Sequence, residues 1–204
     1  MTSPVTGEPT HLVYGFTGTL LNMIRTHQPT KLVVVIDAAG DTETFRTKLY
    51  PEYKANRDEA PEDFGPQVER CLELLRLMRI PVFGLEGVEA DDTIASIITQ
   101  CASDHADLAI RIASRDKDLT QLCSPRVDMF DAMKDALVTP SDVFKTEGVE
   151  PHMVGDILAL MGDTADNIPG VPGIGPKTAA KLIIEHGDLD GLYEALPEIG
   201  RAHV

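Results

Sequence analysis

Short apolar segments that alternate with helical patterns restrict the fold of this 204-residue chain more than any other feature. The segment 31–36 is a β-branched run typical of a strand buried on both faces, and the short apolar segments 81–85 and 108–113 predict two more strands. Apolar residues recur at helical spacing over about 12–24, 68–78 and 94–101, and the pattern is helical again from about Pro140. This alternation predicts an α/β fold with a mostly parallel sheet flanked by helices.

Acidic residues follow each predicted strand, at the edge where a parallel sheet binds its ligands. They are Asp37 after the first strand, Glu89, Asp91 and Asp92 after the second, and Asp116 and Asp118 after the third. Two unit charges about 5 Å apart repel by roughly 3 kcal/mol at an effective dielectric of 20, so such a cluster needs a compensating charge. Carboxylate oxygens suit Mg²⁺ or Mn²⁺, and paired metal ions support phosphodiester hydrolysis. The alternative is that Asp91 and Asp92 only favour the first turn of a helix through its dipole.

A second motif, LMGDTADNIPGVPGIGPKTAAKLI over 160–183, joins an acid pair to a glycine-rich hairpin. Asp163 and Asp166 are three residues apart and can share a helical face or a turn. The glycines let the backbone approach closely, and free N–H groups at the start of the next helix suit a phosphate. Lys177 and Lys181 add positive charge one turn apart. A plain helix–turn–helix connector is the alternative interpretation.

The polar segment that follows the first strand predicts a long loop. Basic and aromatic residues are interleaved in it: Phe45, Arg46, Lys48, Tyr50, Tyr53, Lys54 and Arg57. Because cations hold phosphate and aromatic rings stack on bases, this composition favours a nucleic-acid strand as the ligand. An ordinary solvated loop with one pinned aromatic ring is the alternative.

Charge and cysteine content limit the classes of function. With 33 Asp and Glu against 18 Lys and Arg, the net charge of −15 argues against non-specific nucleic-acid binding through bulk charge. Nucleic acid remains compatible with a chain whose bases are grouped away from its acids. Three cysteines without metal-ligand spacing favour a reducing cytoplasm. We expect neither a membrane segment nor a signal peptide, because no apolar run is long enough and the first ten residues lack an apolar core.

Several segments of the sequence resemble the 5′-nuclease domain of bacterial DNA polymerase I and the wider flap endonuclease and 5′–3′ exonuclease family. They are VVVIDA, TFRTKLYPEYKANR, GVEADDTIAS, SRDKDLTQL and LALMGDTADNIPGVPGIGPKTAAKLI. The resemblance runs from about Val5 to about Leu196. It implies a PIN-like α/β core with a helical arch and a C-terminal helix–hairpin–helix-type DNA clamp. We expect the core to span 1–139 and the clamp to span 140–198.

The resemblance also implies functional residues. Two divalent ions, Mg²⁺ or Mn²⁺, would be held by an acid cluster of Asp37, Glu89, Asp91, Asp92, Asp116, Asp118, Asp163 and Asp166. Some of these acids would bind metal through water. The residues that match arch residues in contact with the scissile phosphate are Lys54 and Arg57. DNA would be bound by Arg46, Tyr53, Gly173, Gly175, Lys177 and Thr178, with a K⁺ ion at the hairpin clamp.

The activity that the resemblance implies is metal-dependent 5′–3′ exonuclease and 5′-flap endonuclease cleavage of DNA and RNA primers in replication and repair. The expected partners are branched, flapped or nicked duplex DNA and RNA primer–DNA hybrids. We expect a monomer, fused to a polymerase domain in the full protein, in the bacterial cytoplasm at the nucleoid. One alternative is a structure-specific DNA-binding module without catalysis. Another is a small-molecule phosphatase, which explains the acids but not the glycine hairpin.

The sequence departs from the family pattern at both ends. Family members begin with a central strand that carries a further metal-binding aspartate, whereas only MTSPVTGEPT precedes the first helical pattern here. We therefore expect the N-terminal strand to be missing and the chain to be a fragment. The last residues, 199–204, resemble a translated sequencing adapter, and we expect them to play no part in the fold. Arg115 stands where a glycine or alanine is common in the family, which would alter the charge at the metal site.

Overall fold

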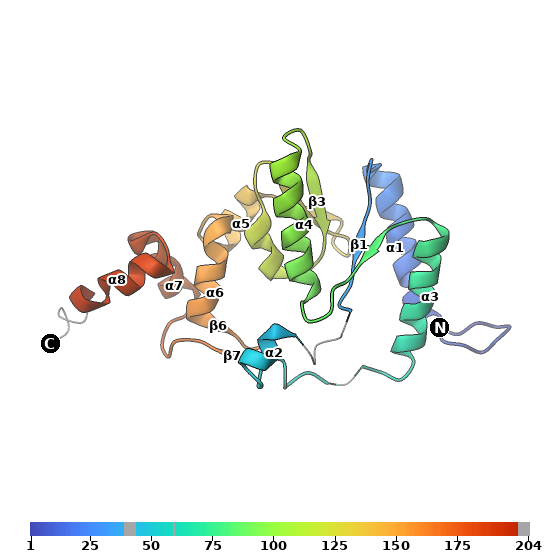
Figure 1. Cartoon of the computed structure of the whole chain (residues 1–204), viewed down its shortest axis with the longest axis horizontal. Helices are drawn as coiled ribbons and strands as arrows, with labels where there is room; N and C mark the ends of the chain where they lie inside the picture. The colour runs from blue at the N-terminus through green and yellow to red at the C-terminus, as the bar shows by residue number, and fades with distance from the viewer. Residues whose placement is uncertain (39–43, 59, 200–204) are drawn as a thin grey trace. The chain divides into compact units, whose positions relative to one another are not determined.

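The computed structural model describes residues 1–38, 44–58 and 60–199 (Figure 1). Their contacts divide the chain into two compact units, and the boundary crosses the helix α4 (Ala90–Asp104). The first unit consists of Met1–Tyr50 and Arg57–Ile94, and the second consists of Pro51–Asn56 and the described residues from Ala95 onward.

The first unit combines a short pair of parallel strands with helices. Its elements are α1 (His11–His27), β1 (Val34–Val35), α2 (Phe45–Leu49), α3 (Phe64–Leu77), β2 (Val82–Phe83) and the first turn of α4. In the parallel pair, Val34 of β1 lies opposite Val82 of β2. α1 packs against α3, and the residues that these helices bury include Leu20, Cys71 and Leu75.

The second unit joins a three-stranded sheet to a helical C-terminal region. After the rest of α4 come β3 (Ile110–Ala113), η2 (Lys117–Leu122), β4 (Val127–Asp131), β5 (Ala136–Val138), α5 (Pro140–Glu147), η3 (Pro151–Met153), α6 (Val154–Met161), β6 (Gly162–Asp163), β7 (Ile168–Pro169), α7 (Pro176–His186) and α8 (Leu189–Ile199). β4 pairs in parallel with β3 and antiparallel with β5. α7 packs against both α6 and α8. The core includes Met129 and Phe130 of β4, and Ala179 and Ile183 of α7.

Local sequence signals set both ends of α5. The Thr139 hydroxyl accepts a hydrogen bond from the N–H of Asp142, while the Asp142 carboxylate accepts from the N–H and hydroxyl of Thr139. Hydrogen bonds from Thr139, and then from Lys145, lower the pKa of Asp142 to about 2. The stability from this cap is therefore complete above the usual pKa of 3.8 and is lost as the pH falls toward about 2. Gly148 ends the helix with a left-handed φ of 78°.

The predicted α/β pattern is confirmed, with shorter strands than the apolar segments suggested. Each predicted strand contains one strand of the structure, and the pairs β1–β2 and β3–β4 are parallel. Within the described residues these pairs belong to separate small sheets rather than to the one sheet that was predicted, and β1 and β2 are each only two residues long. Helix α2, inside the predicted loop, and strands β5, β6 and β7 were not predicted, since each is too short to show a period.

The described helices include none that is long and apolar enough to cross a membrane. At the C-terminal end, α8 reaches Ile199, while residues 200–204, most of the segment predicted to play no part in the fold, lie outside the described residues.

We predict that Leu75→Ala lowers the free energy of unfolding by about 2–5 kcal/mol, because the side chain is 1% exposed and its loss leaves a cavity. The matched control is Leu77→Ala on the same helix, where the leucine is 68% exposed. Urea denaturation followed by circular dichroism measures both. Equal losses for the two variants would contradict the assignment of Leu75 to the core.

Candidate metal centre and nucleic-acid interface

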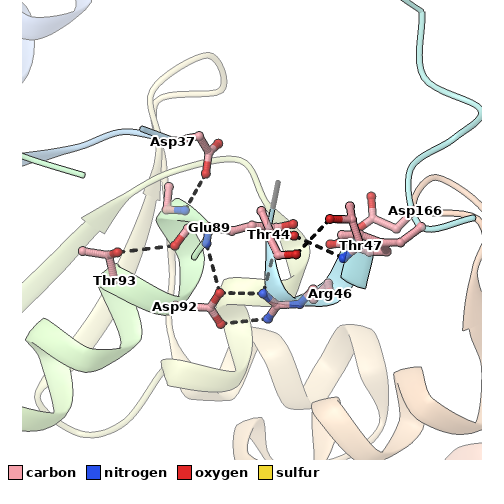
Figure 2. A network of polar contacts seen from close by, with 10 residues as sticks. Asp37, Thr44, Arg46, Thr47, Glu89, Asp92, Thr93 and Asp166 are labelled. Atoms are coloured by element: carbon pink, nitrogen blue, oxygen red, sulfur yellow. Dashed lines mark hydrogen bonds and ion pairs between the residues drawn. The ribbon is translucent and has the colours of Figure 1, made fainter. Parts of the chain in front are cut away.

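Carboxylates of the first unit gather where β1 ends and α4 begins (Figure 2). Asp37 follows β1, and its Oδ1 accepts a 2.6 Å hydrogen bond from the N–H of Ala90, the first residue of α4. Asp92, in the first turn of α4, accepts a 3.2 Å hydrogen bond from the N–H of Glu89. Asp91 lies in the same turn and is partly exposed. Asp37 and Asp92 therefore satisfy backbone donors at the helix start, and Asp91 and Asp92 lie in the first turn, near the positive end of the helix dipole.

Arg46 of α2 balances part of this negative charge (Figure 2). Its guanidinium donates to both carboxylate oxygens of Asp92, over 2.5 and 2.8 Å, and lies 4.0 Å from Oε2 of the buried Glu89. Thr44, which is 1% exposed, caps α2 by accepting a hydrogen bond from the N–H of Thr47. A bidentate pair between arginine and a carboxylate is geometrically specific. Arg46, carried on α2, therefore has a defined position as the counter-charge of Asp92.

A second set of carboxylates lies in the second unit, after β3, at the end of β6 and in the turn between β6 and β7. Asp116 is the N-cap of η2, and its Oδ1 accepts a 3.0 Å hydrogen bond from the N–H of Asp118. Burial raises the pKa of Asp118, and the charges of Asp116, Asp163 and Asp166 raise it further against the opposing effect of Lys117. Within the described structure, Oδ1 of Asp118 is buried and has no hydrogen-bond partner. A buried carboxylate oxygen of this kind is costly unless a cation or donor compensates it.

Two glycines shape the turn that carries Asp163 and Asp166. A Cβ on Gly170 would lie 1.9 Å from the carbonyl oxygen of Met161. A Cβ on Gly162, where φ is 72°, would lie 2.3 Å from the backbone nitrogen of Gly170. No side chain fits at either position without moving the backbone, so this part of the sequence fixes the path of the turn.

Lys117 of η2 forms an ion pair with Asp163. Its Nζ lies 3.0 Å from Oδ2 of Asp163, whose side chain is 11% exposed. Burial alone would raise the pKa of Asp163, but hydrogen bonds from Lys117 and from the N–H of Ala165 bring it below its usual value. The hydrogen bond to Asp163 raises the pKa of Lys117 in turn, although burial opposes it.

Residues 51–56, part of the predicted arch, are fixed to the same turn. The Tyr53 hydroxyl donates a 3.1 Å hydrogen bond to Oδ2 of Asp166, and the N–H of Lys54 donates a 2.9 Å hydrogen bond to the Asp166 carbonyl oxygen. Two asparagine side chains add further bonds, from Asn56 to the Thr164 carbonyl and from Asn167 to the Glu52 carbonyl. Tyr53 is 7% exposed. The segment therefore holds the backbone of Lys54 beside a predicted metal ligand.

The glycine hairpin leads directly into α7. Gly173 has a φ of 83°, and Gly175 is the N-cap of α7, followed by Pro176 at the first helical position. No side chain caps this helix start. Lys177 and Thr178 are exposed in its first turn. The start of α7 therefore presents backbone donors and a positive charge to solvent.

The donor set suits a hard divalent cation without forming a closed cage. Among the residues that the structure describes, no three His, Cys, Asp or Glu side chains are placed to bind one ion together. Mg²⁺ usually keeps several waters and uses one or two carboxylates with substrate phosphate, so a full protein cage is not required. The buried oxygen of Asp118 without a partner is the observation that favours a cation. The first unit groups Asp37, Glu89, Asp91 and Asp92, and the second groups Asp116, Asp118, Asp163 and Asp166.

Three side chains make contacts in the structure that could not be predicted from the sequence. Two of them had a predicted role in DNA binding, and the third had no predicted role. Arg46, predicted to bind DNA, pairs with Asp92, and Tyr53, also predicted to bind DNA, has its ring buried. Lys117 had no predicted role, and its only signal in the sequence is its place between the two acids of SRDKD. The DNA-binding roles of Arg46 and Tyr53 stay predictions, as do the roles of Lys54 and of the exposed Arg57.

Two family models together match the whole chain. Residues 1–150 match the family described as 5′-3′ exonuclease, N-terminal resolvase-like domain, and residues 149–204 match the 5′-3′ exonuclease, C-terminal SAM fold. The chain belongs to the 5′–3′ exonuclease family. This result confirms the resemblance read from the sequence, and with it the predicted fold class.

Relatives of this exonuclease family member include a 5′-3′ exonuclease and a DNA polymerase I. The chain is 43% identical over 206 residues to DNA polymerase I of Rhizobium leguminosarum, covering 98% of this chain and 20% of that protein. It is 40% identical over 188 residues to the 5′-3′ exonuclease of Aquifex aeolicus, covering 92% of this chain and 64% of that protein. The chain thus spans about a fifth of the first relative and less than two thirds of the second.

A solved structure supports the same fold. The bacteriophage T5 D15 flap endonuclease, in a pseudo-enzyme–product complex with DNA and metal ions, matches with a TM-score of 0.75 and 27% identity. The match covers 90% of this chain and 70% of that one. That protein has been solved on this fold with DNA and metal ions bound.

We predict that Tyr53→Phe lowers the free energy of unfolding by about 1–2 kcal/mol, because it removes a hydrogen bond to a carboxylate and keeps the ring. The control is Tyr193→Phe on α8, where the tyrosine is 64% exposed. Thermal denaturation compares the two variants with the parent. If Tyr53→Phe were no more destabilising than the control, the contact between Tyr53 and Asp166 would not hold the arch segment.

Proposed function

We propose that this chain is a divalent-metal-dependent 5′ nuclease, a 5′–3′ exonuclease and 5′-flap endonuclease that forms the N-terminal part of a DNA polymerase I. Its substrates would be flapped, branched or nicked duplex DNA and RNA primer–DNA hybrids in bacterial replication and repair. The observation that carries this proposal is the second-unit acid set around the unpartnered oxygen of Asp118, in a member of the exonuclease family.

Each set of acids would hold metal in its own unit, with Mg²⁺ or Mn²⁺ as the ion. Bound divalent ions would activate water and stabilise the leaving oxygen in phosphodiester hydrolysis. The protein itself contributes the positions of its carboxylates. Asp116 is fixed by its hydrogen bond to the N–H of Asp118, and Asp163 by the N–H of Ala165. Both carboxylates therefore keep their orientation without metal, which lowers the cost of reorganisation when the ion binds.

Basic residues of the arch would neutralise charge on the scissile phosphate. The backbone of Lys54 is anchored at Asp166, so its ammonium is carried on a segment with a defined position. Arg57 follows three residues later and is exposed. A phosphate that gains negative charge during attack is stabilised by such cations.

The hairpin and the start of α7 would grip the backbone of the duplex. Gly173 and Gly175 keep side chains away from a passing phosphate, and the uncapped N–H groups with Lys177 and Thr178 provide donors. A K⁺ ion at the hairpin would add to this grip. Such contacts are independent of base sequence, so they suit an enzyme that selects DNA by its structure.

A DNA-binding module without catalysis is the second candidate. The observation that favours it is that no three metal-ligating side chains of the described residues converge on one point. The two candidates differ in one measurable property, which is turnover in the presence of Mg²⁺.

We predict that Asp116→Asn reduces the rate of 5′-flap cleavage by at least roughly 100-fold while DNA affinity changes little, because a candidate metal ligand is removed at constant size. The assay follows a labelled 5′-flap DNA with Mg²⁺. DNA affinity is measured separately by fluorescence anisotropy with Ca²⁺ in place of Mg²⁺.

The control for this experiment is Asp107→Asn, which changes an exposed acid outside the cluster and should leave cleavage unaltered. Unchanged turnover in Asp116→Asn would remove Asp116 from the mechanism. Flap binding by the parent without any cleavage would favour the second candidate. Hydrolysis of a simple phosphate monoester, with no cleavage of DNA, would favour a phosphatase instead.

A further inference from the structure

Lys117 is a positively charged side chain among the acids of the second unit, Asp116, Asp118, Asp163 and Asp166. It has no role in the proposed reaction. It lies between Asp116 and Asp118 in the sequence, and its ammonium reaches across to Asp163, with Nζ 3.0 Å from Oδ2. The charges of Asp116 and Asp118 also act on it. The ammonium of Lys117 therefore pairs with one candidate metal ligand and lies in the field of two others.

The side chain of Lys117 is free to leave this position, whereas that of Asp163 is not. Lys117 is 62% exposed, and its long stem lets the ammonium move into solvent. Asp163 is 11% exposed and is held by the N–H of Ala165 and by the tight turn between Gly162 and Gly170. A competing cation that arrives at Asp163 would therefore displace the lysine rather than the carboxylate.

We propose that Lys117 is an internal counter-cation, which occupies Asp163 in the metal-free protein and is exchanged for a divalent ion when the second-unit acids bind metal. The inference rests on the proposed function, because it takes those acids as metal ligands. It adds a residue that sets metal affinity without touching the substrate. Metal binding then costs the ion pair of Lys117 with Asp163, and this cost weakens the apparent affinity.

This exchange predicts that removing Lys117 raises the affinity for the metal ion. Loss of a residue beside a binding site normally weakens binding, but loss of a competing cation strengthens it. Lys117 is the exposed partner of this pair, and it contributes no side chain to the core, so a neutral variant that keeps the aliphatic stem should remain folded. Lys117→Met keeps the aliphatic stem and removes the charge.

The experiment is isothermal titration of the whole chain with Mn²⁺, without DNA and at constant ionic strength. We predict that Lys117→Met binds Mn²⁺ roughly tenfold more tightly than the parent, because a screened charge at this distance opposes the ion. Lys117→Arg keeps the charge and should bind no more tightly than the parent.

The matched control is Lys145→Met, which removes a lysine of similar exposure that pairs with Asp142 over 3.1 Å in the same unit. It lowers the net charge equally and should leave the affinity within about twofold of the parent. The same lysine variants are also measured in an Asp37→Asn background, in which Mn²⁺ binding by the first-unit acids is weakened. A change in affinity that persists in this background is assigned to the second unit. Lys117→Gln replaces Lys117→Met if circular dichroism shows that the methionine variant is unfolded.

The outcomes separate this inference from the proposed function. Tighter binding in Lys117→Met, with Lys117→Arg and Lys145→Met close to the parent, supports the exchange. Unchanged or weaker binding in both neutral variants, with normal binding by the parent, overturns the exchange and leaves the nuclease proposal standing. Absence of Mn²⁺ binding by the parent and by every variant would overturn both.

Discussion

Repulsion between neighbouring carboxylates is the constraint on which the arrangement of both units depends. Like charges about 5 Å apart cost roughly 3 kcal/mol at an effective dielectric of 20, so each acid group needs donors or cations close by. In the first unit the guanidinium of Arg46 and the start of α4 supply them for Asp92 and Asp37. In the second unit Lys117 and a backbone N–H supply them for Asp163. The chain thus tolerates its acid groups by means of its own bases and helix ends.

The negative charges of the second-unit acids are not all compensated to the same extent, and this difference bears on where a cation would bind. Asp163 receives donors and its pKa falls, whereas Asp118 is partly buried near other acids and its pKa rises. The pKa values of two carboxylates in one cluster are therefore shifted in opposite directions. Among the described second-unit acids, Oδ1 of Asp118 is buried without a hydrogen-bond partner, so a further positive charge beside it is stabilising. A cation is thus favoured by the same imbalance that makes the metal-free cluster costly.

The sequence predicted the parts of the fold and the site that have a long period or a fixed place along the chain. Strands β1 to β3 and the acids that follow them are of this kind, since a residue directly after a buried strand has few possible positions. The five-residue helix α2 is too short to show a period, so a loop was predicted there. The ion-pair partner of Lys117 also could not be predicted from the sequence. Lys117 has acids on both sides in the sequence, yet it pairs with Asp163 because the turn between β6 and β7 brings that carboxylate to it.

The β6–β7 hairpin joins a local constraint of the sequence to the candidate site. Gly162 and Gly170 leave no room for side chains, so the backbone that carries Asp163 and Asp166 has one path. The arch segment is then fastened to this turn through Tyr53 and the N–H of Lys54. A candidate metal ligand and a candidate phosphate-binding base therefore share one rigid support, although they are far apart in the sequence. Reaction geometry that must hold to within about 1 Å is easier to maintain when both groups move with the same turn.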